Sequence, residues 1–334
     1  MMIKRVRKGL LVLVLLLIVG LMLGFLIATP PELFHESEAQ PGPVGLPTWI
    51  KGQYWLYSFR TPDVDYTTAR VVVADIDASN YQLGISTLLD AQRHAVLNYN
   101  PMLGRVGIAN LSIYEKGEPK SVLVFPLTKG KIWHFSLLGV EEFEARVVAM
   151  ERKCVSDVGR TTLVMIRARA ASGDTLNYSY DSAAGWFRTM EWRGPAGEEL
   201  LMMTLLSTGT GYKGEAYFVR GVDLYDRELN SSRGAPEVEL YDTFIDRGHK
   251  TWGPFDTLVY YYRATTGSRS NIVVTITAHT DAVVRTLRID AEEHQSGLGT
   301  MQSSAGEWGV GFILQGDCTI RLRIAGGITY VWNV

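Results

Sequence analysis

The side chains that most often perform catalysis or bind metals are few in this sequence, and their spacing suits neither task. Six histidines occur among 334 residues, namely His35, His94, His134, His249, His279 and His294. None belongs to an H-x-H or H-E-x-x-H motif or to a pair four residues apart, the spacings that place two imidazoles on one metal. The sequence therefore predicts no metal site and no other cofactor.

Nucleophilic catalysis finds no support either. The chain contains no G-x-S-x-G elbow, no phosphate-binding Walker loop and no dinucleotide-binding glycine motif. Its two cysteines, Cys154 and Cys318, have no histidine beside them and fall in what we expect to be different domains, so we expect neither a reactive thiol nor a disulfide. We predict that the protein is not an enzyme; an enzyme with an unfamiliar type of site is the least favoured interpretation.

Two acidic segments imitate parts of calcium sites. Asp75-Ile-Asp77-Ala-Ser79 spaces its oxygen atoms like the opening of a calcium loop, but Asn80 and Ser86 stand where such a loop needs glycine and glutamate. We interpret this segment as a hairpin turn. A second acidic cluster is interpreted as a solvated loop and consists of Glu141, Glu142 and Glu144.

Three asparagines fit the N-x-[ST] acceptor pattern for glycosylation, and they are Asn110, Asn177 and Asn230. Asn230 is the favoured candidate, because Asn230-Ser-Ser-Arg-Gly-Ala-Pro236 has the composition of an exposed loop. The other two lie within or beside predicted strands.

The N-terminus predicts a membrane anchor. A basic tail at residues 1–9 precedes an uncharged run at 10–28, which as a helix would nearly match the thickness of a hydrocarbon core. The basic tail should stay cytoplasmic, which places the rest of the chain outside; a cleaved signal peptide is the alternative. Residues 29–47, rich in proline, glycine and acid, should form an extended stalk. Gly20 and Gly24 have the spacing of a helix-pairing motif and are candidate homodimer contacts.

Two stretches of the chain read almost alike: Lys51-Gly-Gln-Tyr-Trp55-Leu-Tyr57-Ser-Phe59 and Lys129-Gly-Lys-Ile-Trp133-His-Phe135-Ser-Leu137. Further landmarks recur at an offset of 76 to 81 residues, among them Ala69-Arg-Val-Val72 with Ala145-Arg-Val-Val148, Leu97 with Leu176, and Gly104 with Gly185. We infer two copies of one structural unit, at residues 48–126 and 127–228.

Each copy predicts an antiparallel meander of strands without a helix. Large aromatic side chains alternate along the repeated strand, so one of its faces suits a core. The expected closing hairpins pair 105–114 with 121–126, and 186–192 with 199–206. Two geometries fit, twin small barrels in tandem or two half-barrels facing each other around a shared interior. The second geometry could hold an apolar ligand, for which the candidate contact residues are Trp55 and Trp133.

The patterns Phe125-Pro-Leu-x-x-Gly130-x-x-Trp133 and Tyr180-Asp181-x-x-x-Gly185-Trp-Phe-Arg188 resemble extracytoplasmic proteins of the lipoprotein-carrier type and related β-rich envelope families. In the carriers a curved half-barrel receives acyl chains on its concave face. The resemblance therefore implies a half-barrel and an extracytoplasmic location. This chain differs from the carriers in that no helices are predicted to plug its barrel, a difference that argues against lipid transport.

The C-terminal region predicts a separate β-sandwich. Residues 208–236 are rich in glycine, serine and charge and are interpreted as a linker. Beyond them, residues 236–334 carry strand-like runs at 256–264, 270–279, 281–290, 308–315 and 319–324. The ending from Ala305 to Ile324 resembles the last hairpin of GOLD-like and other jelly-roll modules, which generally bind or present and do not catalyse.

The expected fold is thus an all-β ectodomain, two tandem repeats followed by a C-terminal sandwich, after one transmembrane helix. A formal net charge of −2, with no long basic run beyond the N-terminus, argues against nucleic-acid binding. We expect a single-pass cell-membrane protein with a cytoplasmic N-terminus. Its ectodomain would bind an apolar ligand such as a lipid between the repeats, or an envelope protein through the sandwich. A structural envelope component without a ligand is the alternative.

Overall fold

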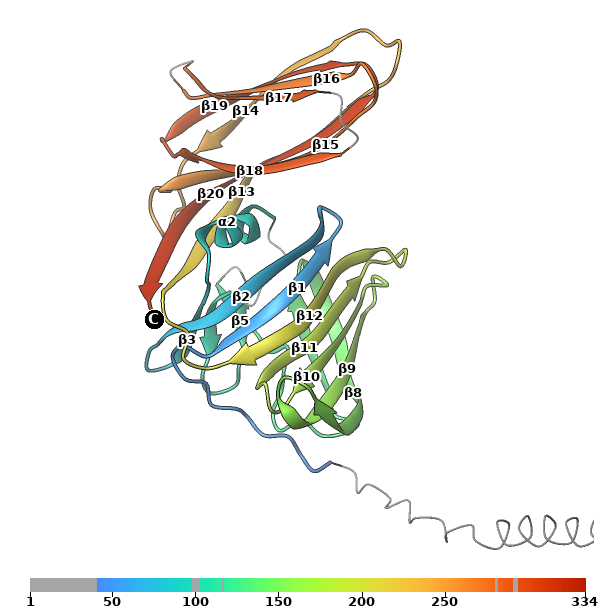
Figure 1. The fold of residues 1–334 in the computed structure, drawn as a ribbon, viewed down its shortest axis with the longest axis vertical. Helices are drawn as coiled ribbons and strands as arrows, with labels where there is room; N and C mark the ends of the chain where they lie inside the picture. Colours follow the sequence, from blue (N-terminus) through green and yellow to red (C-terminus); the bar gives the residue numbers. More distant parts are fainter. Residues whose placement is uncertain (1–40, 98–102, 116, 280–281, 291–293) are drawn as a thin grey trace, which may run out of the picture. The chain divides into compact units, whose positions relative to one another are not determined.

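The structure is a computed structural model, and it describes residues 41–97, 103–115, 117–279, 282–290 and 294–334. These residues form antiparallel strands and one helix (Figure 1). The elements up to residue 209 are β1 (Tyr54–Thr61), β2 (Val64–Ile76), β3 (Asn80–Ile85), α2 (Leu88–Leu97), β4 (Gly104–Gly107), β5 (Ile113–Glu115), β6 (Glu118–Lys120), β7 (Ile132–Leu137), β8 (Val140–Val155), β9 (Gly159–Ala170), β10 (Thr175–Asp181), β11 (Trp186–Arg193) and β12 (Glu199–Gly209). The later elements are β13 (Glu215–Ser231), β14 (Val238–Asp246), β15 (Thr257–Thr266), β16 (Asn271–Thr277), β17 (Val283–Asp290), β18 (Gln295–Gln302), β19 (Gly306–Gln315) and β20 (Cys318–Asn333).

Most strands belong to one antiparallel sheet, whose order runs β18-β15-β20-β13-β3-β2-β1-β12-β11-β10-β9-β8-β7, with β4, β5 and β6 branching from β3. The two sequence copies meet in this sheet through β1 and β12, where Tyr54 lies opposite Gly209 and Arg60 opposite Met202. Strands β1 to β12 curve around one interior and are called the half-barrel below (Figure 1). Of the two geometries left open by the sequence, twin small barrels are wrong, because the copies share one sheet that does not close within the described residues.

The helix α2 contradicts the prediction that the copies contain no helix. Thr87 caps its start, since the Thr87 hydroxyl donates to the Asp90 carboxylate at 2.5 Å and accepts from the Asp90 amide at 3.3 Å. Val96 and Leu97 at its end are buried against strands. The second copy has β10 at the corresponding place. The repeated leucine is therefore the last residue of a helix in the first copy, Leu97, and part of a strand in the second, Leu176.

The two predicted hairpins have opposite outcomes. The first is wrong, because β5 pairs with the short β6, with Tyr114 opposite Pro119, and residues 121–126 form no strand. Val122 and Leu123 instead enter the core. The second is confirmed, because β11 pairs with β12 across residues 194–198.

The predicted aromatic face of the repeated strand is confirmed as core. In β1 the alternate side chains of Trp55, Tyr57 and Phe59 are 0%, 0% and 3% exposed. In the equivalent strand β7, Trp133 and Phe135 are 8% and 6% exposed. All five belong to one cluster of buried side chains that fills the half-barrel from both copies. The copies therefore share a single packed interior.

The C-terminal region forms the expected sandwich-like pair of antiparallel layers. A four-stranded sheet in the order β14-β19-β16-β17 packs against the part of the large sheet formed by β18, β15, β20 and β13. The core between them contains apolar side chains of both sheets, such as Trp308, Phe312, Tyr260 and Leu322. Aromatic and β-branched residues dominate these strands, which suits a pleated, half-buried surface.

Residues 215–231, inside the segment interpreted as a linker, form the long strand β13. β13 pairs along its whole length with β20, from Glu215 opposite Asn333 to Ser231 opposite Cys318. It also pairs with β3, where Tyr217 lies opposite Ile85. One strand thus connects the sheet of the half-barrel with that of the sandwich.

Several expectations about the N-terminus fall outside the described residues. These are the span at 10–28, its candidate dimer contacts Gly20 and Gly24, and most of the stalk. Within the part of the chain that the structure describes, no helix has the length and apolar character needed to cross a membrane. Cys154 and Cys318 are both free thiols.

The buried carboxylate of Asp181 organises the turn between β10 and β11. The side chain of Asp181 is 0% exposed, and it accepts hydrogen bonds from the Thr161 hydroxyl at 2.5 Å and from the amides of residues 183–184 at 2.9 and 3.1 Å. Arg188 donates to it through Nε at 2.9 Å and Nη2 at 2.7 Å, and also pairs with Asp157 at 3.0 Å. Burial of the charge is therefore offset by a cation and several donors.

This turn supplies acceptors to aromatic residues of the first copy. The Gly185 backbone has a φ of 70°, which glycine adopts without strain. The donors and acceptors are Trp49 Nε1 to the Gly185 carbonyl at 3.0 Å, Trp55 Nε1 to the Ala184 carbonyl at 2.8 Å, and the Tyr57 hydroxyl to the Phe187 carbonyl at 2.7 Å. The motif from Tyr180 to Arg188 therefore has a structural role in joining the two copies.

We predict that Asp181→Ala lowers the free energy of unfolding by about 3–5 kcal/mol, because it leaves Arg188 partly buried without its main partner. The measurement is chemical denaturation followed by tryptophan fluorescence, to which Trp49, Trp55 and Trp186 contribute because they pack together beside the turn. Glu199→Ala, which breaks the exposed Arg60–Glu199 pair, is the control and should unfold close to wild type. Equal effects of the two substitutions would contradict the assignment.

Candidate functional site

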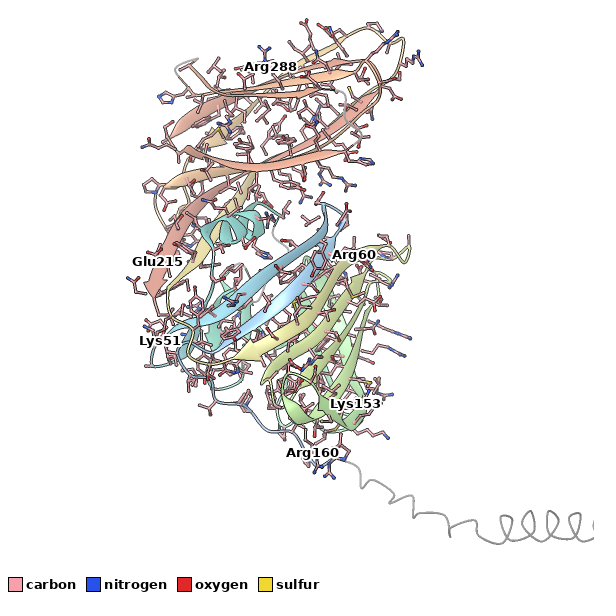
Figure 2. All side chains as sticks on the ribbon, in the orientation of Figure 1. Lys51, Arg60, Lys153, Arg160, Glu215 and Arg288 are labelled. Atoms are coloured by element: carbon pink, nitrogen blue, oxygen red, sulfur yellow. The ribbon has the colours of Figure 1, made fainter. Side chains whose placement is uncertain are left out.

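A cavity of about 540 Å³ lies between the half-barrel and the sandwich and is called the junction cleft below. Its walls come from the β1–β2 turn and the start of β2, from α2, from β15, and from the first half of β18. Arg60, labelled in Figure 2, lies near the end of β1 where that turn begins. The lining residues are Asp63, Val64, Asp65, Tyr66, Thr67, Arg93, Tyr261, Arg263, His294, Gln295, Ser296, Gly297 and Leu298. The volume is within the range of ligand sites.

Hydrogen bonds and an ion pair hold the β1–β2 turn against β15 and β20. The Tyr261 hydroxyl donates to the Asp63 carbonyl at 2.5 Å, and the Arg263 guanidinium donates to the Pro62 carbonyl. Arg323 pairs with the nearly buried Asp63 carboxylate at 3.2 Å and also with Asp226 at 3.2 Å. The β1–β2 turn, one wall of the junction cleft, is therefore fixed by groups from elements far apart in the sequence.

The junction cleft carries three groups that can bind an anion. Arg93 reaches it from α2, held by Thr67 Oγ1 at 3.2 Å and by Asp90 at 2.5 Å. Arg263 comes from β15, and His294 stands just before β18 with its Nδ1 3.0 Å from the Thr265 hydroxyl. The cleft also contains two carboxylates on the half-barrel side, Asp63, which Arg323 neutralises, and the exposed Asp65. The side formed by α2 and the sandwich carries both arginines of the cleft and is called the cationic side, although Asp90 pairs with Arg93 there.

A second cavity, of about 270 Å³, is lined in part by Arg323. Its walls include apolar side chains, Leu97, Leu138 and Trp192 among them, together with the carboxylates of Glu115, Asp223 and Asp226. Hydrogen bonding from Arg321, followed by the nearby Arg323, holds the pKa of Asp226 below its usual value. Arg323 therefore bridges a carboxylate of each cavity.

The two tryptophans predicted as ligand contacts lie in the shared core and line neither cavity. Trp55 is 0% exposed and donates to the Ala184 carbonyl, and Trp133 is 8% exposed. The side chains of Val122, Leu123 and Leu127 belong to the same cluster. The interior between the repeats is therefore occupied by the chain itself around both tryptophans.

The three candidate glycosylation sites have different settings. Asn110 is exposed in the turn before β5, where its Oδ1 accepts from the Ser112 amide at 3.0 Å. Asn177 is half-buried within β10. Asn230 is exposed, but it belongs to β13 opposite Thr319, so the prediction that it lies in a loop is wrong.

The acidic segments serve as ordinary surface structure. The hairpin interpretation of residues 75–79 is confirmed, since the Asp77 carboxylate accepts from the amides of Ser79 and Asn80 at 2.8 Å between β2 and β3. The cluster expected in a loop lies instead within β8, where its exposed Glu144 is 3.7 Å from His134. No group of three histidine, cysteine or acidic residues suited to a metal occurs among the described residues.

Sequence reasoning missed every residue of the junction cleft. One local signal was available, the Thr87-x-x-Asp90 cap that begins α2 and so places Arg93 on a helix. Asp63, Arg263 and His294 come from separate elements whose spacing in the chain says nothing about their proximity.

Comparisons with known proteins do not assign the chain to a family. No protein family profile matches the sequence, and no curated protein matches it either. Among solved structures, MucB in complex with MucA(peri) aligns with 79% of this chain and 87% of its own at 12% identity and a TM-score of 0.26. A family 43 arabinoxylan arabinofuranohydrolase from Bacillus subtilis aligns with 87% of this chain and 69% of its own at 11% identity and a TM-score of 0.18.

The tailspike protein 4 domain of bacteriophage CBA120 aligns with 34% of this chain and 19% of its own, at 11% identity and a TM-score of 0.21. These similarities to β-rich proteins are too distant to assign a fold family. The glycoside hydrolase is likewise too distant to bear on whether this chain has enzymatic activity.

The imidazole of His94, on α2, gives the stability of the protein a testable pH dependence. His94 packs edge-on against Phe59, with ring centroids 5.2 Å apart, and burial lowers its pKa to about 4, opposed by Asp90 and assisted by Arg93. Between an unfolded pKa of about 6.5 and the folded value, the unfolded chain binds a proton that the folded chain does not. Stability from this group is therefore complete above about pH 6.5 and decreases as the pH falls toward 4.

We predict that His94→Gln reduces the loss of stability on acidification, by at most about 1.4 kcal/mol for each pH unit below 6.5. The measurement is the free energy of unfolding at several values between pH 7.5 and 4.5. His134→Gln, at a histidine exposed on β7, should keep the wild-type slope. If both variants lose the slope equally, His94 is not its source.

Proposed function

We propose that the chain is a membrane-anchored extracytoplasmic protein that binds another protein of the cell envelope through the junction cleft. The observation that carries the proposal is the cleft itself, a polar cavity of about 540 Å³ assembled from the half-barrel and the sandwich together. Convergent polar groups in a cavity of this size are typical of binding sites. The exposed ring of Tyr66, 67% accessible on one wall, is the kind of aromatic contact enriched at protein interfaces.

The filled interior speaks against the other expected ligand, an apolar molecule between the repeats. Trp55, Tyr57 and Trp133 would have to leave their buried positions to admit a lipid chain. Re-exposing one large apolar side chain costs about 1.5–3 kcal/mol, so several such movements would have to be offset by the ligand. A protein partner at the surface requires none of them.

The membrane location of this function rests on the sequence of the N-terminus. The uncharged run at 10–28 and the basic residues before it predict one span with the N-terminus inside the cell. The stalk at 29–47 would then hold residues 48–334 away from the bilayer while keeping them near envelope partners. Tethering of this kind raises the effective concentration of a partner on the same membrane.

We predict that a photo-crosslinking amino acid at Tyr66 captures a protein partner in cells that naturally produce the chain. The matched control is the same amino acid at Tyr241, a tyrosine 64% exposed on β14 and outside the junction cleft. Native mass spectrometry of the purified chain accompanies the experiment. Lipid mass that disappears on denaturation would favour the apolar ligand, and no adduct at Tyr66 with no added mass would favour a purely structural envelope component.

We predict that deleting residues 10–28 releases the protein from washed membranes. The physical reason is that this run is the single segment expected to cross the bilayer. Membrane and soluble fractions are compared by immunoblot with those of the intact chain. If the deleted protein still sediments with membranes after a high-salt wash, the single-anchor topology is wrong.

A further inference from the structure

Strand β18 is an open edge of the large sheet. It ends the strand order and pairs with β15 alone, from Gln295 opposite Ala264 to Gln302 opposite Thr257, without a bulge. On its other side no described strand pairs with residues 296–302. A regular strand edge of this kind presents a row of amide and carbonyl groups that can pair with another chain.

The other sheet edges carry the protection that β18 lacks. At β7, the Leu138 amide that follows the strand donates to Glu115, and Lys120 donates to Ser136. Strand β14 has charged residues, including Glu239 and Asp242. Strand β17 has Arg285 and Arg288, the latter labelled in Figure 2, and its pairing with β16 contains an irregularity. Strand β18, with the sequence Gln-Ser-Gly-Leu-Gly-Thr-Met-Gln, has no charge and no proline.

The two faces of β18 offer different surroundings to an added strand. On the sandwich side Gly297 and Gly299 lie under tyrosine rings, since a Cβ at either position would come within 2.4 Å of Tyr262 or 2.3 Å of Tyr260. Tyr262 is half-buried and leaves part of its side chain accessible. Apolar side chains of an added strand would extend the packing on this face.

On the opposite face, β18 forms a wall of the junction cleft. Ser296 lies opposite Arg263 and Leu298 opposite Tyr261, and all four residues line the cleft. The added strand would therefore direct every second side chain toward the cationic side of the cleft, where Arg263 and Arg93 stand. Arginine pairs most strongly with carboxylates, so acidic side chains suit these positions.

We propose that β18 receives an extended segment of the partner protein as an additional strand, in which acidic residues facing the junction cleft alternate with apolar residues facing the sandwich. The inference deepens the proposed function and rests on it, because it specifies how a protein partner would occupy the cleft. Backbone hydrogen bonds to β18 would supply affinity, and the alternating side chains would supply specificity. The exposed carboxylate of Asp65, on the β2 wall of the cleft, could pair with one basic residue of the segment.

The test uses the full chain in detergent micelles and a fluorescein-labelled probe peptide of eight residues, the length of β18, in which valine and glutamate alternate. Binding is measured by fluorescence anisotropy. We expect binding to the acidic peptide and roughly tenfold weaker binding when lysine replaces each glutamate. Arg263→Gln should weaken binding of the acidic peptide by roughly tenfold and have little effect on the lysine peptide.

N-methylation of the peptide separates strand addition from charge attraction. Methyl groups on the amides of alternate residues block one edge of the peptide and keep its charge. One of the two alternate sets should abolish binding, and the other set should leave it within about threefold of the parent peptide. Equal affinity of both methylated peptides would overturn the proposal, because charge alone would then explain binding.

Three further outcomes distinguish this inference from its alternatives. A concentration-dependent dimer that Thr300→Lys, at an exposed position of β18, converts to a monomer would assign the edge to a second copy of the chain and reject the proposal. A cellular adduct at Tyr66 without any peptide binding would reject strand addition and leave the proposed function standing. Peptide binding without a cellular adduct would instead support the edge as a strand receptor and reject the proposed envelope partner.

Discussion

The half-barrel depends on how one buried carboxylate is satisfied. Asp181 is completely shielded from water, and a charge in that position is tolerated only when a cation and several donors surround it. Arg188 supplies the cation, and the turn that follows β10 supplies amide donors. Once this turn is fixed, its carbonyl groups are aimed at the indoles of Trp49 and Trp55, which would otherwise be buried donors without acceptors.

The same arrangement explains why two similar sequence copies produce one unit. Each copy has an aromatic strand whose large side chains point to one side, and a lone curved sheet would leave that side exposed. Pairing of β1 with β12 joins the copies at their edges, and the Asp181 turn joins them through the interior. Because these two contacts join the copies, the rest of each copy can differ, and the first copy forms a helix where the second has β10.

The features that could be predicted from the sequence are those that depend on the alternation of apolar and polar side chains along a strand. The core face of β1 follows from the period of two in Trp55, Tyr57 and Phe59. The β11–β12 hairpin follows from two such runs around Gly194-Pro-Ala-Gly197. The helix α2 could not be predicted, because at 10 residues it is shorter than three turns and its apolar periodicity is correspondingly weak. Only the cap at Thr87 marks its start.

Composition was a poor guide where it conflicted with tertiary pairing. Strand β13 has glycine and many charges, which resemble a linker, yet sixteen of its seventeen residues find partners on β20. The junction cleft was beyond prediction for a related reason. Its walls are brought together by the shared sheet and by the Asp63–Arg323 pair, and neither leaves a pattern in the local sequence.

Where a β-rich protein can bind depends on which of its backbone and side-chain groups are already engaged. In the half-barrel the aromatic side chains and the segment at 122–127 fill the interior, so a ligand there competes with the chain's own packing. At β18, in contrast, the amide and carbonyl groups on one edge already pair with β15, and this pairing fixes the groups on the other edge in strand geometry. A partner strand would lose its own conformational freedom but would require no rearrangement of the receiving edge, and preorganisation of this kind favours binding at the edge over binding in the interior.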